Sequence, residues 1–407
     1  MKLAMLTQYY PPEIGAPQRR LASLASHFLR AGHEVTVLTA MPTYPLGRVH
    51  PGYGGLTRRE VIDGVQVLRT FIYPTQKTDY ARRLANYFSF VLSSAVYGTV
   101  ELDSPDYLLV ESPPLFLGLS GAWLGAIKRT RVIFNVSDLW PESAVRLGVV
   151  REGSMVHRVS ARLEAFCYRR AWMVTGQSRE IIANVAERFP SCRTYHLSNG
   201  VECSAFGPER ATAEARATLG ANGRCIALYA GLHGIAQGLG QLLDAADAMR
   251  GDAGGPDLVL MGEGPTKAAL VADAAARGLG DRVRFLDPRP AAALPPLLAA
   301  ADILVVPLGL GIPGAVPSKM YEAMATGRPV VLVATGEAAN VVREHRAGIV
   351  VEPGDIAGLT AALRTLRDQP ALRAELGANG RRAVERHFDR AEIAARFIRT
   401  LEAELAR

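Results

Sequence analysis

The stretch KLAMLT (residues 2–7) opens the pattern that decides the fold, because it is a short apolar segment with the length of one β-strand. A loop rich in proline and glycine follows it. The next segment, RRLASLASHFLRAG (19–32), places leucines and Phe28 at helical spacing, and HEVTVLTA (33–40) is a second strand candidate. Strand, loop, helix and strand within forty residues predict a βαβ unit of a parallel sheet.

The same pattern returns two hundred residues later. CIALYAG (225–231) and DLVLMGEGP (257–265) flank a glycine-rich loop and the helix candidate QLLDAADAMRG (241–251). The strand candidates are continuous runs of Val, Ile and Leu, which are typical of sheets covered on both faces. We therefore expect an α/β fold of two doubly wound, Rossmann-like domains.

The predicted domains are residues 1–200 and 201–385, and a C-terminal helix, 386–407, is expected to pack back on the first domain. Ligands of doubly wound domains bind beyond the carboxyl ends of the strands. A cleft between the two domains is therefore the expected binding site.

Composition indicates a globular protein in a reducing compartment. Of the 407 residues 49% are hydrophobic and 21% charged, and the four cysteines are far apart in the chain. The N-terminal apolar stretch is too short for a signal peptide. The uncharged stretch at residues 112–127, broken by prolines and glycines, is shorter than the roughly 20 residues of a membrane-spanning helix. We expect a cytoplasmic protein without a membrane-spanning helix.

Positive charge is concentrated in the first half of the chain. Residues 1–200 hold 23 Lys and Arg against 15 Asp and Glu, whereas the remainder holds 23 against 24. An anionic partner surface or a solvated, arginine-rich surface both explain this excess. Residues 79–97, DYARRLANYFSFVLSSAVY, form a helix candidate with an aromatic stripe, preceded by Lys77. Such a helix either lies in a membrane interface or packs in a core.

The stretch PSKMYEAMATGRPVV (317–331) carries the candidate chemistry. Its start suits a helix entry with Ser318 as N-cap, so that free backbone amides and the Lys319 ammonium can bind an anion. Glu322 lies one turn further on and can accept hydrogen bonds from paired ribose hydroxyls. A plain capped helix with an exposed lysine is the alternative. The preceding GLGIPGAVP (309–317) favours a ligand, because glycines permit close backbone approach.

Together, several motifs resemble glycosyltransferase family 4, retaining enzymes with the two-domain GT-B fold. The motifs are PPEIGAPQRR (11–20), LSNGVE (197–202), LMGEGP (260–265) and YEAMATGRPVV (321–331). NVSDLWPES (135–143), NYFSFVLSS (86–94) and PSK (317–319) are most similar to the WbuB-type transferases of surface polysaccharide synthesis. The resemblance spans nearly the whole chain.

The resemblance implies a role for Glu322 as the ribose-binding second glutamate of an E-x7-E motif, whose first position is Gly314 here. After Gly231, Leu232 and Gln237 stand where the family has an arginine and a lysine on the diphosphate. These departures move the expected diphosphate contacts to other groups. They are Lys319, His233 and the backbone amides from Gly314 to Ser318, whereas Pro317 and Gln237 are expected more generally to line the donor site.

Further site residues follow from the resemblance. Gly262, Glu263 and Gly264 match a glycine turn beside the nucleotide. The backbone around Pro288 and Arg289 matches the uracil contact, and Gly15 matches a loop facing the donor phosphates. On the acceptor side, the matching residues are Arg19, Asp138 and Glu142. Asp138 can orient or deprotonate an acceptor hydroxyl, or it simply caps the next helix. The expected catalytic residues are Asp138, Lys319 and Glu322.

The implied activity is transfer of a sugar, such as the N-acetylated deoxyhexosamine L-FucNAc, from a UDP-sugar to a polyprenyl-diphosphate-linked or glycan acceptor. No cofactor and no metal are expected, since neither an Asp-x-Asp triplet nor a H-x-x-x-H spacing occurs. The expected place of action is the inner face of the cytoplasmic membrane, with an anionic lipid surface and no nucleic acid as partner. A UDP-sugar epimerase of the same fold and a non-catalytic nucleotide-sugar-binding scaffold remain alternatives.

Overall fold

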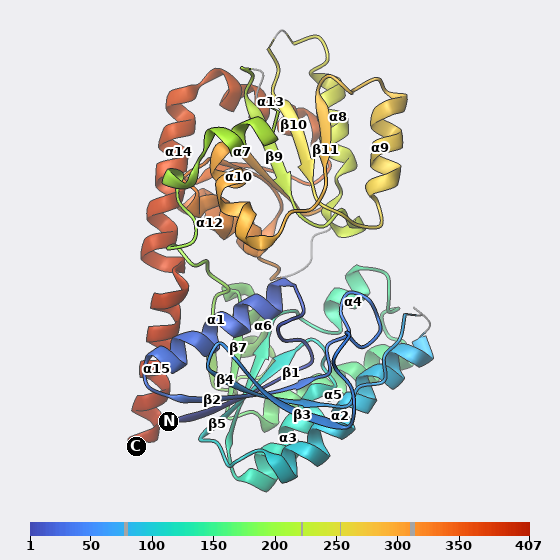
Figure 1. The fold of residues 1–407 in the computed structure, drawn as a ribbon, viewed down its shortest axis with the longest axis vertical. Coiled ribbons are helices and arrows are strands. Elements are labelled where there is room, and N and C mark those ends of the chain that lie inside the picture. Colours follow the sequence, from blue (N-terminus) through green and yellow to red (C-terminus); the bar gives the residue numbers. More distant parts are fainter. Residues whose placement is uncertain (77–79, 221–222, 253, 310–313) are drawn as a thin grey trace. The chain divides into compact units, whose positions relative to one another are not determined.

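The computed structural model describes residues 1–76, 80–220, 223–252, 254–309 and 314–407 (Figure 1). Lys77 and residues 310–313 of the glycine-rich entry lie outside the described residues, as does the side chain of Tyr80. The chain forms two compact units. Unit 1 comprises Met1–Asn199 and Arg390–Arg407, and unit 2 comprises Gly200–Asp389.

Unit 1 is built on an eight-stranded sheet with the order β3-β4-β2-β1-β5-β6-β7-β8. Its strands are β1 (Lys2–Thr7), β2 (Glu34–Ala40), β3 (Thr57–Ile62), β4 (Val65–Thr70), β5 (Tyr107–Ser112), β6 (Arg131–Val136), β7 (Met173–Gly176) and β8 (Thr194–His196). All neighbours are parallel except the β3–β4 hairpin. Asp63 and Gly64 turn that hairpin with φ of 49° and 83°, the positive angles that a tight two-residue turn requires.

Helices cover both faces of this sheet (Figure 1). They are α1 (Ala16–Arg30), α2 (Tyr80–Glu101), α3 (Leu117–Lys128), α4 (Glu142–Arg146), α5 (Met155–Arg170), α6 (Arg179–Arg188) and α15 (Arg390–Leu405). The C-terminal helix α15 packs beside α1, with the rings of Phe28 and Phe397 6.2 Å apart. The core on the other face of this sheet contains side chains of α2, α3 and α5, among them Phe90, Leu124 and Cys167.

The predicted aromatic stripe of residues 79–97 is not a single buried face. Phe90 and Val91 are buried, together with Ser94, whereas Phe88 and Leu92 of the stripe are exposed. The helix therefore packs through a face that includes small hydroxyl residues. Spacing alone could not reveal this, because both sides of α2 carry large apolar side chains.

Unit 2 holds a six-stranded, all-parallel sheet with the order β11-β10-β9-β12-β13-β14. Its strands are β9 (Ile226–Ala230), β10 (Asp257–Met261), β11 (Val283–Leu286), β12 (Ile303–Pro307), β13 (Val330–Val333) and β14 (Gly348–Val351). Its α-helices are α7 (Ala213–Thr218), α8 (Gly240–Ala248), α9 (Lys267–Ala276), α10 (Leu294–Ala300), α11 (Ser318–Ala325), α12 (Gly336–Glu344), α13 (Ile356–Asp368) and α14 (Pro370–Ala383). Short 3-10 turns lie at Pro208–Arg210, Ile235–Gln237 and Ala291–Ala293, and a π-helix at Val384–Phe388.

The order of the strands places the candidate site. Side chains of β9, β10, β12 and β13 fill two apolar cores, one on each face of the sheet. Strands β9, β10 and β12 are neighbours and run in the same direction, so the loops that follow them meet at one edge. These loops contain the glycine-rich segments that the sequence singled out.

Replacing Phe397 by alanine should destabilise unit 1 by about 3–5 kcal/mol, because the fully buried ring contacts α1 and leaves a cavity. Urea unfolding followed by tryptophan fluorescence measures this change. The method is specific, since Trp123, Trp140 and Trp172, the three tryptophans of the chain, all belong to unit 1. Leu405→Ala on the exposed end of α15 is the matched control and should change the unfolding free energy by less than about 1 kcal/mol. Equal losses for both variants would contradict the packing described for α15.

Candidate functional site

Helix α11 begins directly after the loop that follows β12. Its N-cap is Pro317, in an extended conformation with φ −68° and ψ 129°, and no side chain caps the first turn. The prediction that Ser318 is the N-cap is therefore wrong: Ser318 is the first helical residue. The reason is that the rigid proline already supplies the extended entry. The amide groups of the first turn thus have no side-chain partner at the cap.

The polar residues of α11 share one face of the helix. At 100° per residue, Ser318, Lys319 and Glu322 fall within one 100° arc. All three are half-buried, whereas Met320 and Met324 are buried in the core and anchor the helix. An ammonium group, a carboxylate and the amide-lined helix start are therefore presented on the same side.

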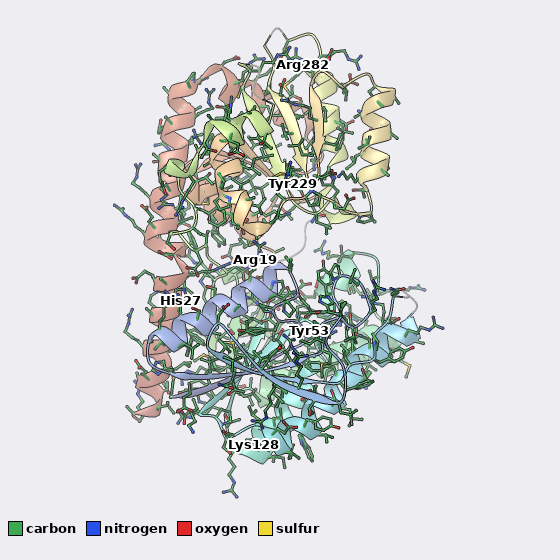
Figure 2. The ribbon with its side chains drawn as sticks, viewed as in Figure 1. Arg19, His27, Tyr53, Lys128, Tyr229 and Arg282 are labelled. Atoms are coloured by element: carbon green, nitrogen blue, oxygen red, sulfur yellow. The ribbon has the colours of Figure 1, made fainter. Side chains whose placement is uncertain are left out.

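Lys319 reaches across to the end of β9. Its Nζ lies 3.5 Å from the hydroxyl oxygen of Tyr229 and 5.2 Å from the centroid of that ring. Tyr229 is labelled in Figure 2. A Cβ atom at position 231 would overlap Nζ, so a side chain there would force this lysine to shift from its observed position. The predicted residues Gly231 and Lys319, 88 positions apart, are thus brought into contact.

His233 is the most unusual group of this loop. Its side chain is fully buried, and neither ring nitrogen has a hydrogen-bond partner among the described residues. Burial lowers the pKa of the imidazole, and the neighbouring ammonium groups of Lys267 and Lys319 lower it further. His233 is therefore neutral near pH 7, with one nitrogen able to donate and the other able to accept.

Two glycines bring the β10 loop against the β9 loop. Gly262 and Gly264 have φ of 150° and 156°, and a Cβ on either would overlap backbone atoms of Gly231 or His233. The backbone amide of His233 donates to the Glu263 carbonyl at 2.9 Å. The carbonyl of His233 accepts from the Thr266 hydroxyl at 2.8 Å. The glycine turn predicted at 262–264 therefore fixes the position of His233.

Gln237 closes the same loop. Its Oε1 is buried and has no hydrogen-bond partner among the described residues. The loop is also joined to the end of β12, because the Gly309 amide donates to the Ala236 carbonyl at 2.8 Å. The neighbouring side chains of Leu232 and Ile235 are exposed. His233 and Gln237 together leave three buried polar atoms of this loop without partners among the described residues, and His233 lies within electrostatic range of the Lys319 ammonium.

Glu263 and Arg289 lie on the exposed rim. Glu263 accepts hydrogen bonds from the Gly264 amide and the Lys267 ammonium, both at 3.2 Å, and these bonds lower the pKa of its carboxyl. Lys267 also pairs with Asp287 at 2.9 Å, two residues before the exposed Arg289. The sequence analysis missed Lys267, although its position four residues after Glu263 on a helix start was a usable signal.

Gly314 is buried and has φ of 72°. A glutamate at this position would be strained, because L-residues rarely adopt this conformation. The backbone therefore explains why the residue eight positions before Glu322 is a glycine in this chain.

In unit 1, Gly15 is the N-cap of α1, and a Cβ there would overlap the amide side chain of the buried Gln18. Arg19, labelled in Figure 2, is exposed. The next residue, Arg20, forms an ion pair with the buried Glu111 at the end of β5. The sequence analysis missed this pair.

Glu111 is the centre of a polar network at the carboxyl ends of β5, β6 and β7. Its carboxylate accepts from the Ser137 hydroxyl and from the Asn135 amide, both at 2.6 Å. Asn135 in turn accepts from the Thr175 hydroxyl at 2.7 Å. A glutamate at the end of an apolar strand, YLLVES, was the available signal. The network holds the segment that leads to Asp138.

Asp138 follows β6 and is half-buried. Burial raises the pKa of its carboxyl, whereas the Ser143 hydroxyl and the Leu139 amide lower it. The N-cap of α4 is Pro141, so Asp138 is not the cap of this helix. Glu142 starts α4 and forms an ion pair with Arg188 at 3.4 Å.

The described part of the chain shows neither a metal-binding cluster nor a membrane-spanning helix. No group of three His, Cys, Asp or Glu side chains there has an arrangement that could hold a metal ion. Within the same residues, the helices are too short or too polar to span a membrane.

Two family models match the chain. The model "Glycosyl transferase 4-like domain" matches residues 15–200, and "Glycosyl transferases group 1" matches residues 224–369. The chain is 26% identical over 411 residues to WcaI of Escherichia coli K12, named for colanic acid biosynthesis, with 98% of this chain and 99% of WcaI covered. It is 27% identical over 298 residues to the protein named glycosyltransferase WbjE of Pseudomonas aeruginosa, covering 71% of this chain and 68% of WbjE.

Solved structures have the same architecture. The sucrose-phosphate synthase of Thermosynechococcus elongatus superposes with a TM-score of 0.77 at 20% identity, covering 100% of this chain and 99% of the synthase. HepE of Anabaena, solved with UDP and glucose, superposes with a TM-score of 0.73 at 18% identity, covering 99% of this chain and 100% of HepE. The expected fold of two Rossmann-like domains is confirmed. With a glycosyltransferase model on each unit and this architecture, the chain belongs to the glycosyltransferases of the GT-B fold.

Proposed function

We propose that this chain transfers a sugar from a UDP-sugar to a lipid-linked or glycan acceptor in the synthesis of a surface polysaccharide. The observation that carries the proposal is the set of buried, unpartnered atoms of His233 and Gln237 in one loop, in which His233 lies near the Lys319 ammonium. Buried polar groups are normally hydrogen-bonded, so such atoms indicate a missing partner. The UDP bound by HepE and the colanic acid assignment of WcaI support the choice of donor and product class.

The diphosphate of the donor is assigned to the start of α11. The helix dipole contributes about 0.3–1 kcal/mol to anion binding, and up to about 2 kcal/mol when partly buried. This is too little for a leaving diphosphate, and the Lys319 ammonium adds a full charge at the same place. Neutral His233 can donate a further hydrogen bond without competing for a proton. Lys319 thus takes over the role of the family's arginine and lysine, which are Leu232 and Gln237 here.

The remaining assignments are extensions of the proposal. Glu322, on the same face of α11, accepts the ribose hydroxyls, and Asp138 in unit 1 orients or deprotonates the acceptor hydroxyl. Burial raises the pKa of the Asp138 carboxyl, which makes its carboxylate a stronger base toward an acceptor hydroxyl. Retention of configuration, a sugar such as L-FucNAc, the WbuB-type subgroup and independence of cofactors and metals follow from the resemblance described above.

The test of function is an assay of transfer with purified protein. A panel of UDP-sugars is incubated with polyprenyl-diphosphate-linked N-acetylglucosamine, and lengthening of the lipid is followed by mass spectrometry. Lipid lengthening with one donor is expected. Interconversion of free UDP-sugars without an acceptor would indicate an epimerase instead. Binding of UDP without any turnover across the panel would indicate a scaffold.

Lys319→Ala should weaken UDP binding by about 10- to 100-fold, because a charge-assisted hydrogen bond to the diphosphate is lost. Calorimetric titration with UDP and with uridine separates this role from a general defect. Uridine has no phosphate, so its affinity should not change. Arg343→Ala, which removes an exposed cation of α12, is the matched control and should bind UDP normally. An unchanged UDP affinity of Lys319→Ala would refute the diphosphate assignment.

His233 should make the stability of unit 2 depend on pH below about 6.5, the pKa of an unfolded histidine. Between the lowered folded pKa and this value, the unfolded state binds a proton that the folded state does not. The unfolding free energy therefore rises with pH in this window, by at most about 1.4 kcal/mol per pH unit. This contribution of His233 is lost on acidification. Urea unfolding followed by circular dichroism at pH 5.5 and 7.5 measures it. His233→Asn should reduce the slope, whereas His345→Asn should not. Equal slopes for wild type and His233→Asn would contradict a buried neutral imidazole.

A further inference from the structure

Helices α2 and α3 form one continuous layer on unit 1. The ring of Phe88, in the first half of α2, is 4.8 Å from that of Phe116, the N-cap of α3. Further along both helices, Trp123 Nε1 donates to the Thr99 hydroxyl at 3.0 Å. The two helices therefore run in parallel. Helix α5 packs beside α3, and all three cover the sheet face opposite α1 (Figure 1).

The outward side of this layer is apolar. On α2, exposed apolar residues recur every four positions, and α3 repeats the same spacing. The residues are Phe88, Leu92, Val96 and Val100 on α2, and Leu119, Trp123 and Ile127 on α3. Leu92 is 67% exposed and Trp123 53%. Side chains that recur every four residues lie along one helix face, so these two rows form a patch and are not scattered exposures.

Helix α5 adds a mixed border to this patch. Met155, Val159 and Phe166 are exposed, and arginines stand between them. The exposed arginines of α5 are Arg158, Arg162, Arg169 and Arg170. Lys128, labelled in Figure 2, ends α3, and Arg82 and Arg83 lie in the first turn of α2. Apolar side chains are thus bordered by basic ones.

Carboxylates are almost absent from the three helices. They contain two acidic residues, Glu101 and Glu164. Glu164 is fully buried and paired with Arg188, and Glu101 pairs with Arg59 at 3.1 Å. The outward side therefore presents apolar surface and positive charge without an unpaired carboxylate.

We propose that the outward sides of α2, α3 and α5, here called the docking face, insert into the interface of an anionic lipid bilayer. Apolar residues with a tryptophan enter the boundary between headgroups and acyl chains, and the basic border attracts the anionic headgroups. A second copy of the chain is a poorer partner, because two like faces would bring their arginines together. The inference rests on the proposed function in that a lipid-linked acceptor brings the enzyme to a bilayer.

The first test is co-sedimentation with vesicles of phosphatidylcholine, with and without phosphatidylglycerol. Binding is expected only with the anionic lipid. The double variant Leu92→Ser and Trp123→Ser should weaken it by about tenfold or more, because two exposed insertion residues are removed. The matched control, Val61→Ser and Val149→Ser, removes equally exposed apolar residues of unit 1 outside the docking face and should bind as wild type.

The attraction of the basic border to anionic lipid and the depth to which Trp123 inserts are tested separately. Arg158→Glu with Arg162→Glu should abolish the preference for the anionic lipid, whereas Arg343→Glu with Arg346→Glu, the same charge change in unit 2, should not. Lipids brominated on the acyl chain should quench the fluorescence of Trp123. Trp123→Phe keeps the ring apolar, so binding should persist while most of the quenching is lost.

Three outcomes would overturn the proposal. They are vesicle binding that the double serine variant does not weaken, no vesicle binding by the wild type, and a dimer that this variant dissociates in the absence of lipid. Titration with UDP is measured on every variant and should not change, since all substituted docking residues belong to unit 1. If the wild type binds UDP normally but does not bind vesicles, the docking proposal fails and the transferase proposal stands. If the wild type binds vesicles but not UDP, the transferase proposal fails and the docking proposal stands.

Discussion

The contact between Lys319 and Gly231 is the constraint on which the candidate site depends. The lysine belongs to the first turn of α11, and the glycine follows β9, so the contact ties two strand ends of unit 2 together. Gly231 has no side chain, so the Lys319 ammonium lies against the chain at the end of β9, close to the Tyr229 hydroxyl. The same lysine stands in the first turn of α11, whose amides have no side-chain cap. The neighbouring buried imidazole of His233 is neutral, so it offers hydrogen-bonding groups without further positive charge.

The departures from the family pattern become consistent once this contact is considered. An arginine at position 232 and a lysine at 237 would add two cations to this loop. Like charges in one site raise the free energy of keeping each group ionised. With Leu232 and Gln237 at these positions, no further cation is added to the ammonium groups of Lys267 and Lys319 near His233. Gly314, whose backbone excludes a glutamate without strain, removes an acidic side chain from the same region. Relative to the family pattern, these positions thus lack two positive charges and one negative charge.

Much of the fold could be predicted from the sequence, because most strands of both units are continuous apolar runs, β3 (TRREVI) being an exception. The glycine turn at 262–264 and its place beside the 231–238 loop also follow from the βαβ pattern. The Arg20–Glu111 pair could not be predicted, since it joins residues 91 positions apart whose distance depends on how α1 packs on the sheet. Ser318 was misassigned because the preceding proline already serves as the N-cap, and the β3–β4 hairpin was missed although Asp63 and Gly64 are a strong turn signal.

The position of α15 has a consequence for biosynthesis. Unit 2 is inserted between Asn199 and Arg390 of unit 1, so the last helix of unit 1 leaves the ribosome after the whole of unit 2. Until then the apolar side of α1 around Phe28 has no cover from Phe397. Unit 2, a contiguous segment, can complete its core earlier than the unit that starts the chain. The nascent protein therefore passes through a stage with one finished unit and one exposed groove, the kind of surface that chaperones bind.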